Sequence, residues 1–163
     1  SDHGYHLGEK QRWSKFSLWE RTTHVPLIVS VPDGLKGRTD KPVELLSIYP
    51  TLIDLCGLQV NPKLEGVSLK PLLKNPHSVW EHVAISTLGY NNHAVRDERW
   101  RYIRYADGSE ELYDHQTDPN EWSNLAVQSL TPGHDAIIAR LKKHLPGTNR
   151  PQRGAQPKKE NPL

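Results

Sequence analysis

The spacing of apolar residues changes along the chain, and each spacing predicts a different kind of element. Residues 25–31 (VPLIVSV) form a nearly continuous apolar run, which is typical of a strand buried on both faces of a parallel sheet. Across residues 43–55, apolar side chains recur every three or four positions, which predicts a helix with one buried face. Pro50 falls inside this run, so we expect a kink or a break there, and Gly57 is expected to cap the helix end.

From His82 onward, apolar and polar residues alternate, which predicts strands. The stretches with this pattern are 83–86, 93–97, 100–105 and 111–113. Asp107 and Gly108 provide a hairpin turn ahead of the last of these stretches. We therefore expect an antiparallel sheet of about four strands with one face in water. Residues 134–145 predict an amphipathic helix that covers the other face.

The predicted fold class is α/β, with two structured parts and a tail. Residues 1–76 are expected to form the end of an α/β sheet domain, and residues 77–146 a small antiparallel-sheet subdomain with a packed C-terminal helix. We place the boundary between Lys74 and His82, around Pro76. Residues 147–163 combine Pro, Gln, Lys and Asn and have too little apolar area to offset the entropy of ordering, so we expect disorder there.

The composition favours a part of a larger protein. Hydrophobic residues make up 35% of the chain, which is low for a self-sufficient domain, and the 163 residues include no Met. We therefore expect a C-terminal fragment of a longer enzyme, whose missing N-terminal part is its first partner. The single cysteine, Cys56, excludes an internal disulfide, and its place in an apolar helical run predicts a buried, unreactive thiol.

The charge distribution argues against nucleic-acid binding. The formal net charge is +2, and residues 147–163 alone hold four basic residues and one acidic residue. The basic balance therefore belongs to the tail and not to a folded surface with clustered Lys and Arg. No stretch approaches the roughly 20 apolar residues that a membrane-spanning helix needs, so we expect no membrane span.

The first residues carry the most specific chemistry. Asp2 and His3 place a carboxylate oxygen beside an imidazole nitrogen, and Gly4 lets the backbone turn sharply next to them. Such a pair is able to bind a metal ion, and Lys15 adds a flexible ammonium that could meet an anion on the same metal. The alternative is a turn Asp next to a surface His. A zinc site with His3 and His6 is a further alternative.

The order of these residues resembles a known family. Ser1-Asp2-His3-Gly4, Leu7-Gly8-Glu9, Trp13, Lys15 and His24-Val25-Pro26-Leu27 resemble the C-terminal part of a type I sulfatase of the alkaline phosphatase superfamily. Residues 46–57, 64–69 and 113–125 continue the resemblance. The most similar subgroup comprises the iduronate-2-sulfatase-like and choline-sulfatase-like enzymes, in which His stands beside the metal-binding Asp.

The resemblance implies a fold, a reaction and a cofactor. It implies that residues 1–76 are the end of the catalytic α/β domain and that the whole protein hydrolyses a sulfate ester of a sulfated carbohydrate, of glycosaminoglycan type. It also implies calcium, bound by Asp2, His3 and ligands elsewhere, with Lys15 at the sulfate as a catalytic and substrate-binding residue. A formylglycine nucleophile, made from a Cys/Ser-x-Pro-x-Arg motif, is expected upstream because that motif is absent here. The implied location is periplasmic, secreted or lysosomal.

Several other residues are candidates for substrate contact. Tyr5 could stack on a sugar ring, and Trp13 either does so or packs in the interior. His6 either lines the pocket or packs on the loop, and His93 follows a polar loop that could select the substrate. Glu9 is expected to hold the loop by accepting backbone N–H bonds, Lys10 and Arg12 to be charges at the rim, and His24 to be a possible neighbour of the cleft.

Two other functions fit the same residues. One is a phosphatase or phosphonate monoester hydrolase of the same superfamily, since an Asp-His-Gly loop serves phosphate as well as sulfate. The other is a degenerate sulfatase that binds sulfated glycans without catalysis. A sequence that holds only part of the site is expected to be inactive alone.

Overall fold

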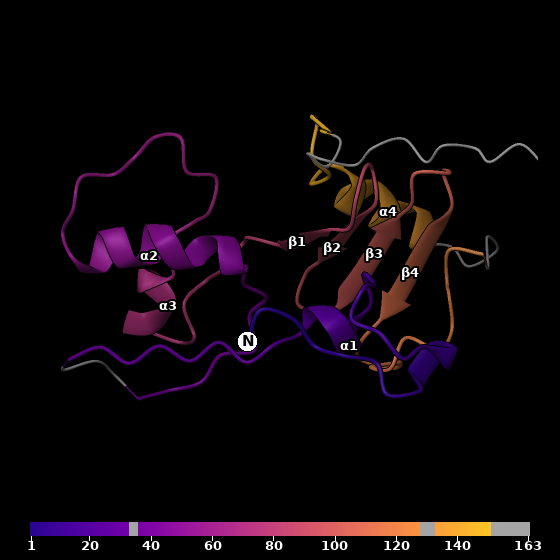
Figure 1. Ribbon diagram of the computed structural model, residues 1–163, viewed down its shortest axis with the longest axis horizontal. Helices are drawn as coiled ribbons and strands as arrows, with labels where there is room; N and C mark the ends of the chain where they lie inside the picture. The colour runs from indigo at the N-terminus through magenta and orange to yellow at the C-terminus, as the bar shows by residue number, and fades with distance from the viewer. Residues whose placement is uncertain (33–35, 128–132, 151–163) are drawn as a thin grey trace, which may run out of the picture.

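An antiparallel sheet forms the centre of the computed structural model, which describes residues 1–32, 36–127 and 133–150. Its strands are β1 (Ala84–Thr87), β2 (His93–Arg96), β3 (Trp100–Arg104) and β4 (Glu110–Asp114), hydrogen-bonded in the order β1-β2-β3-β4. Gly108, with a φ of 87°, lies in the turn between β3 and β4. The structure therefore confirms the predicted sheet and its hairpin turn (Figure 1).

One face of the sheet is covered by α4 (His134–Lys142), as the amphipathic pattern predicts. The buried residues at this contact are Val95, Tyr102, Leu112 and Leu141. The helix ends at Lys142, earlier than the predicted limit at 145, and the chain continues in turns.

The opposite face of the sheet is also covered, so the expectation of one face in water is wrong. Leu18 packs into a buried cluster with Ala94, Ile103 and Tyr113, and Trp19 lies against the same cluster. The covering segment includes η1 (Glu9–Gln11) and α1 (Glu20–Thr23) and comes from the start of the chain. Alternation along a strand assigns residues to two faces, but it does not reveal that a distant segment will cover the second one.

The apolar run at 25–31 forms no strand in the structure, contrary to the prediction. Its backbone is extended, and the side chain of Ile28 is 88% exposed. A strand requires a neighbour that bonds its N–H and C=O groups. The described residues provide only one contact of this kind that is not local, from the Ser1 ammonium to the carbonyl oxygen of Pro26 (3.1 Å).

The predicted helix at 43–55 is divided, but the division lies ahead of Pro50. A 3-10 turn, η2 (Leu45–Ser47), leads into α2 (Ile48–Leu55). Pro50 therefore lies in the first turn of α2, where a backbone N–H has no partner within the helix and its absence does no harm. Gly57, with a φ of 63°, follows the helix end as predicted.

The apolar face of α2 is less buried than its spacing predicts. Ile53 is buried, whereas Leu46, Tyr49 and Leu52 are each more than half exposed. The helix α3 (Lys70–Lys74) packs on the Ile53 side, where Leu69 and Leu72 are also buried. Cys56 at the end of α2 is exposed, so the prediction of a buried thiol is wrong.

The predicted boundary near Pro76 falls between α3 and β1, in a segment without helix or strand. Most of the tail at 147–163 lies outside the described residues, so its predicted disorder stays a prediction. Among the residues that the structure describes, no helix is long and apolar enough to cross a membrane.

Replacing Leu141 by Ala is expected to lower the free energy of unfolding by about 2 to 5 kcal/mol, because a fully buried side chain leaves a cavity between α4 and the sheet. Urea unfolding followed by tryptophan fluorescence measures this loss. Leu58→Ala, at a site that is 61% exposed, is the matched control and should change the free energy by less than about 0.5 kcal/mol. Equal losses for the two variants would contradict the packing described above.

Asp114, at the end of β4, predicts a pH dependence of stability. Arg99 donates to both of its carboxylate oxygens (2.9 and 2.7 Å) and holds the pKa of Asp114 below its ordinary value. A lowered folded-state pKa adds stability above the unfolded pKa of about 4, and this contribution is lost as the pH falls through the folded value. The stability difference between wild type and Asp114→Asn should therefore shrink below about pH 4. Asp40→Asn, at an exposed site, serves as the control, and a difference for Asp114→Asn that does not vary with pH would sink the prediction.

Candidate functional site

Residues 1–24 fold into a compact loop that carries most of the predicted site residues (Figure 1). Gly4 donates to the carbonyl oxygen of Thr22 (2.9 Å), and His6 donates to that of Ser14 (3.0 Å). A Cβ at Gly4 would lie 2.0 Å from the carbonyl oxygen of Arg21, so only glycine fits this close approach. Gly4 therefore allows the close backbone approach that we expected next to Asp2 and His3, although residues 1–6 form no turn.

Asp2 and His3 lie side by side at the start of the loop. His3 Nε2 is 3.8 Å from Asp2 Oδ2, and the Asp2 side chain is 87% exposed. His3 Nδ1 is 2.9 Å from the carbonyl oxygen of Gly4, which assigns the Nδ1 proton to that bond in the neutral ring. In this tautomer the Nε2 lone pair lies near a carboxylate oxygen, an arrangement in which a cation between the two atoms would be favourable.

The electrostatics of the Asp2 carboxyl suit a cation ligand. Its own backbone N–H and the adjacent His3 lower the pKa of Asp2, and the charge of Lys15 adds to this effect. A carboxylate that stays ionised and an imidazole nitrogen with a free lone pair are a suitable donor set for a divalent cation. The two residues fit part of a metal site, and the remaining ligands would come from elsewhere.

Lys15 is exposed and lies close enough to Asp2 to influence its pKa. Its Nζ lies 5.6 Å from the centre of the Phe16 ring, and it forms no ion pair within the described ranges. The exposed ammonium of Lys15 is available to an anion, and its charge contributes to the lowered pKa of Asp2.

The aromatic candidates of the loop are partly exposed. The Tyr5 hydroxyl donates to the carbonyl oxygen of Trp13 (3.2 Å), and half of the Tyr5 residue remains exposed. Trp13 is 70% exposed, so the interpretation that it packs in the interior is wrong, because it lies over Gly8 on the outside of the loop. Both rings are accessible to a ligand.

The two histidines that we expected at the substrate are both buried. His6 is 1% exposed, its Nε2 is 2.9 Å from Ser17 Oγ, and burial lowers its pKa. This position favours the alternative that His6 packs inside the loop. His93, in β2, is bonded through Nδ1 to Thr87 Oγ1 (2.8 Å) and through Nε2 to Asn149, so substrate contact would require these bonds to break.

The charged residues of the loop hold it in place. Glu9 accepts the N–H of Leu7 (2.7 Å), which confirms its predicted role, and pairs with Arg21 (3.1 Å). Lys10 is not a rim charge as predicted. Its Nζ lies 4.7 Å from the Trp19 ring centre and donates to the hydroxyl of Tyr113 (3.1 Å), and burial lowers its pKa.

Arg12 and His24 lie on the outer side of the same loop. Arg12 is exposed, with its guanidinium 5.5 Å from the ring centre of Trp19. His24 is exposed and pairs with Glu20 (3.0 Å). Arg12 therefore remains available as a charge at the rim.

One buried group of ionisable residues was missed by the sequence analysis. Arg101 in β3 contacts Glu20 at the start of α1 and lies 2.6 Å from Glu121, which is also 2.9 Å from His115. The ligand atoms of Glu20, His115 and Glu121 are close enough together to hold a metal ion. The Arg101 guanidinium already contacts both carboxylates, so a cation there would have to displace it. The period-two pattern placed Arg101 on the second sheet face but gave no sign that this face is buried.

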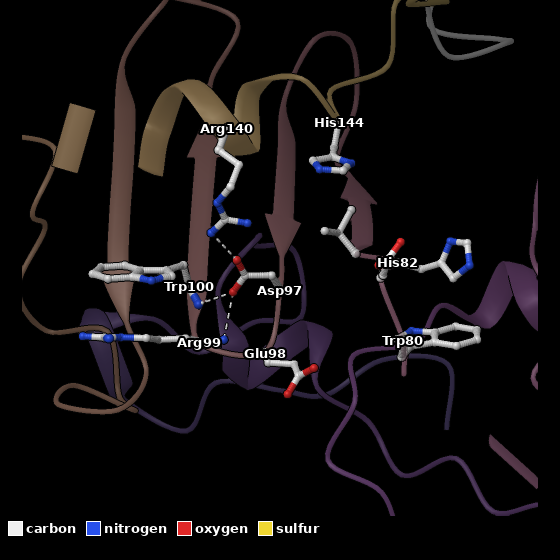
Figure 2. A pocket seen from close by; sticks show the side chains of 10 residues that line it. Trp80, His82, Asp97, Glu98, Arg99, Trp100, Arg140 and His144 are labelled. Carbon is white, nitrogen blue, oxygen red and sulfur yellow. Dashed lines mark hydrogen bonds and ion pairs between the residues drawn. The ribbon is translucent and has the colours of Figure 1, made fainter. Parts of the chain in front are cut away.

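A hollow of about 360 Å³ lies on another side of the sheet and is lined by Trp80, His82, Asp97 and Trp100, among others. Figure 2 shows Arg140 and the backbone of Arg99 and Trp100 directed at the Asp97 carboxylate, with the Arg140 contact at 2.6 Å. Asp97 and Arg140 pair with each other, whereas Arg99 pairs with Asp114 and Glu98 with Lys41, which do not line the hollow. The predicted site residues are not among those that line this hollow.

Residues 8–150 match the family described as "N-sulphoglucosamine sulphohydrolase, C-terminal". A sulfatase from Formosa agariphila is 47% identical over 150 residues, which are 91% of this chain and 29% of the relative. The chain therefore spans less than a third of the length of this relative.

Two solved structures resemble the fold. BT1596, described as a 2-O GAG sulfatase, is 30% identical with a TM-score of 0.69, and the match covers 86% of this chain and 33% of that protein. The phosphonate monoester hydrolase SpPMH from Silicibacter pomeroyi is 27% identical with a TM-score of 0.72, and the match covers 86% of this chain and 32% of that enzyme.

Proposed function

This chain belongs to the sulfatases, in the family described as N-sulphoglucosamine sulphohydrolase, C-terminal, and we propose that the whole protein hydrolyses sulfate esters of a sulfated sugar. The observation that carries the proposal is the identity to the Formosa agariphila sulfatase across nearly the whole chain. The neighbouring positions of Asp2, His3 and Lys15 support it, because they combine cation ligands with an ammonium for an anionic substrate.

Asp2 and His3 are the residues of this chain that would hold a divalent cation, which we propose to be calcium. When bound, such a cation polarises the oxygens of the ester and orients it. Asp2 contributes an exposed, ionised carboxylate, and His3 is oriented by the bond from Nδ1 to the carbonyl oxygen of Gly4. The other ligands and a formylglycine nucleophile are expected in parts of the protein outside this sequence.

Lys15 is proposed to act on the ester directly. Its ammonium would stabilise the negative charge that grows on a sulfate oxygen or on the leaving oxygen, and this stabilisation is strongest where water is excluded. The side chain is exposed in the structure, so it is able to reach a substrate without breaking an ion pair within the described ranges.

The substrate class that we propose is a sulfated sugar of glycosaminoglycan type. The likeness to a 2-O GAG sulfatase supports this choice. The exposed rings of Tyr5 and Trp13 lie on the same loop as Lys15 and offer apolar faces with a polar edge, which suit a sugar ring. We propose a periplasmic, secreted or lysosomal location, as the membership in the sulfatases implies.

Hydrolysis of phosphonate monoesters is the second candidate function. The likeness to the phosphonate monoester hydrolase from Silicibacter pomeroyi favours it, since the match covers a similar share of this chain. Asp2, His3 and Lys15 would serve a phosphonate anion as well as a sulfate, because both present negatively charged oxygens to a cation. A sulfated-glycan binder without catalysis is the third candidate.

The whole protein is expected to hydrolyse an aryl sulfate with a kcat/KM at least about tenfold above that for an aryl phosphate or a phenylphosphonate monoester, a difference of about 1.4 kcal/mol. Steady-state release of the aryl alcohol measures all three rates. A clear preference for the phosphonate would select the second candidate. Binding of a sulfated oligosaccharide without turnover of any ester would select the third.

Replacing Asp2 by Ala should weaken calcium binding and remove most of the activity, because one charged ligand is lost. Replacing Lys15 by Ala should lower kcat by about a hundredfold while calcium binding remains. Calorimetric titration of the chelator-treated whole protein with calcium, together with steady-state kinetics, separates the two effects. Asp40→Ala and Lys63→Ala, at exposed sites, are the matched controls, and wild-type rates in Asp2→Ala and Lys15→Ala would count against the site.

A further inference from the structure

A buried ion network joins the sheet to the loop that carries Asp2, His3 and Lys15. It consists of Arg101 in β3, Glu20 at the start of α1 and Glu121 after β4, with His115 bonded to Glu121. Arg101 is 3% exposed and Glu121 1%. We propose that Arg101 and Glu121 are positioning residues that hold this loop in the shape its chemistry needs. That this loop shape serves ester hydrolysis rests on the proposed function.

The network is hydrogen-bonded to the backbone at the first turn of α1. Glu121 Oε2 accepts the backbone N–H of Glu20 (2.9 Å), and Arg101 donates to the carbonyl oxygen of Leu18 (3.1 Å). These two bonds fix the backbone on both sides of Trp19. The start of α1 is therefore attached to the sheet through its main chain, in addition to the Glu20 carboxylate.

Hydrogen bonds at the other end of α1 connect the helix to the backbone next to the proposed site residues. The carbonyl oxygen of Thr22 accepts the N–H of Gly4, directly after Asp2 and His3. The Thr22 hydroxyl is 2.6 Å from Ser17 Oγ, and the N–H of Ser17 donates to the carbonyl oxygen of Lys15 (3.2 Å). A displaced α1 would thus move the backbone beside the cation ligands and beside the ammonium together.

The positive charge of Arg101 allows the carboxylates of Glu20 and Glu121 to lie close together. Burial by itself would raise the pKa of Glu20, but Arg101, together with His115 and Arg96, outweighs that effect and keeps the pKa of Glu20 below its ordinary value. Without Arg101, the half-buried carboxylate of Glu20 would lie beside the buried carboxylate of Glu121. Arg96, 3.7 Å from Glu20, and His115 would be the remaining neighbours able to carry a positive charge. Such a pair relieves its repulsion by protonation of one carboxylate or by separation, and either change weakens the ionic contact between α1 and the sheet.

The backbone turn that contains Glu121 fixes the direction of the Glu121 side chain. Glu121 has a φ of 59°, a left-handed conformation that is uncommon for a residue other than glycine. Asp118 supports it, because its carbonyl oxygen accepts the N–H of Glu121 (3.1 Å) and its carboxylate that of Ser123 (2.8 Å). The Asp-Pro-x-Glu turn therefore directs a carboxylate under the loop at the cost of a strained backbone.

The whole protein with Arg101→Met tests the proposal. Amide hydrogen exchange across residues 2–22 should become faster, calcium binding weaker and kcat lower by about ten- to a hundredfold. Arg101→Lys should lie between wild type and Arg101→Met, since an ammonium keeps the charge but cannot bond Leu18 and both carboxylates together. Arg99→Met is the matched control: it removes an ion pair from the same sheet, with Asp114, that does not touch the loop.

Each outcome decides a separate claim. Exchange across residues 2–22 that is unchanged in Arg101→Met, or raised equally by Arg99→Met, overturns the positioning role. If Arg101→Met does not fold, as judged by circular dichroism, Glu121→Gln takes its place with the same expected and contrary results. Absence of any ester hydrolysis in the wild type would refute the proposed function alone, because hydrogen exchange tests the positioning without it.

Discussion

The structure depends on one guanidinium that lies between two carboxylates. Arg101 points from β3 into the space beneath the N-terminal segment, where Glu20 and Glu121 both contact it. A buried charge is stable only when it is compensated, so each member of this group requires the others. Sequence positions that are far apart are brought together by that requirement, and the second face of the sheet is closed by the segment that carries Glu20.

This constraint explains how a small sheet supports a loop rich in functional side chains. A loop of polar and aromatic residues has little hydrophobic area with which to hold itself in place. Here Leu18 and Trp19 pack on the sheet, Lys10 lies over Trp19 and Tyr113, and the ion network fixes α1. The side chains of Asp2, Tyr5, Trp13 and Lys15 are left on the outer side, where a ligand is able to reach them.

Two groups of potential metal ligands occur in the described residues, and their surroundings give them different roles. Glu121 is buried, and Glu20 and His115 are half-buried, around a guanidinium that already supplies the positive charge. Asp2 and His3 are near the surface, with a carboxylate oxygen facing an imidazole nitrogen. The first group already contains its positive charge, and the second offers two donor atoms that a cation would be able to bind.

The sequence by itself determined the features that depend on neighbours in the chain. Alternating residues and the Asp107-Gly108 turn indicated the four strands, and the apolar spacing of 134–145 indicated the helix that the structure has as α4. Only the tertiary structure decided which faces are covered. It exposed Ile28 and Cys56, which local pattern placed inside, and buried Arg101 and His93, which local pattern placed outside or at the site. The physical reason is that the burial of a residue depends on which segment packs against it, and in this protein that segment is distant in the sequence.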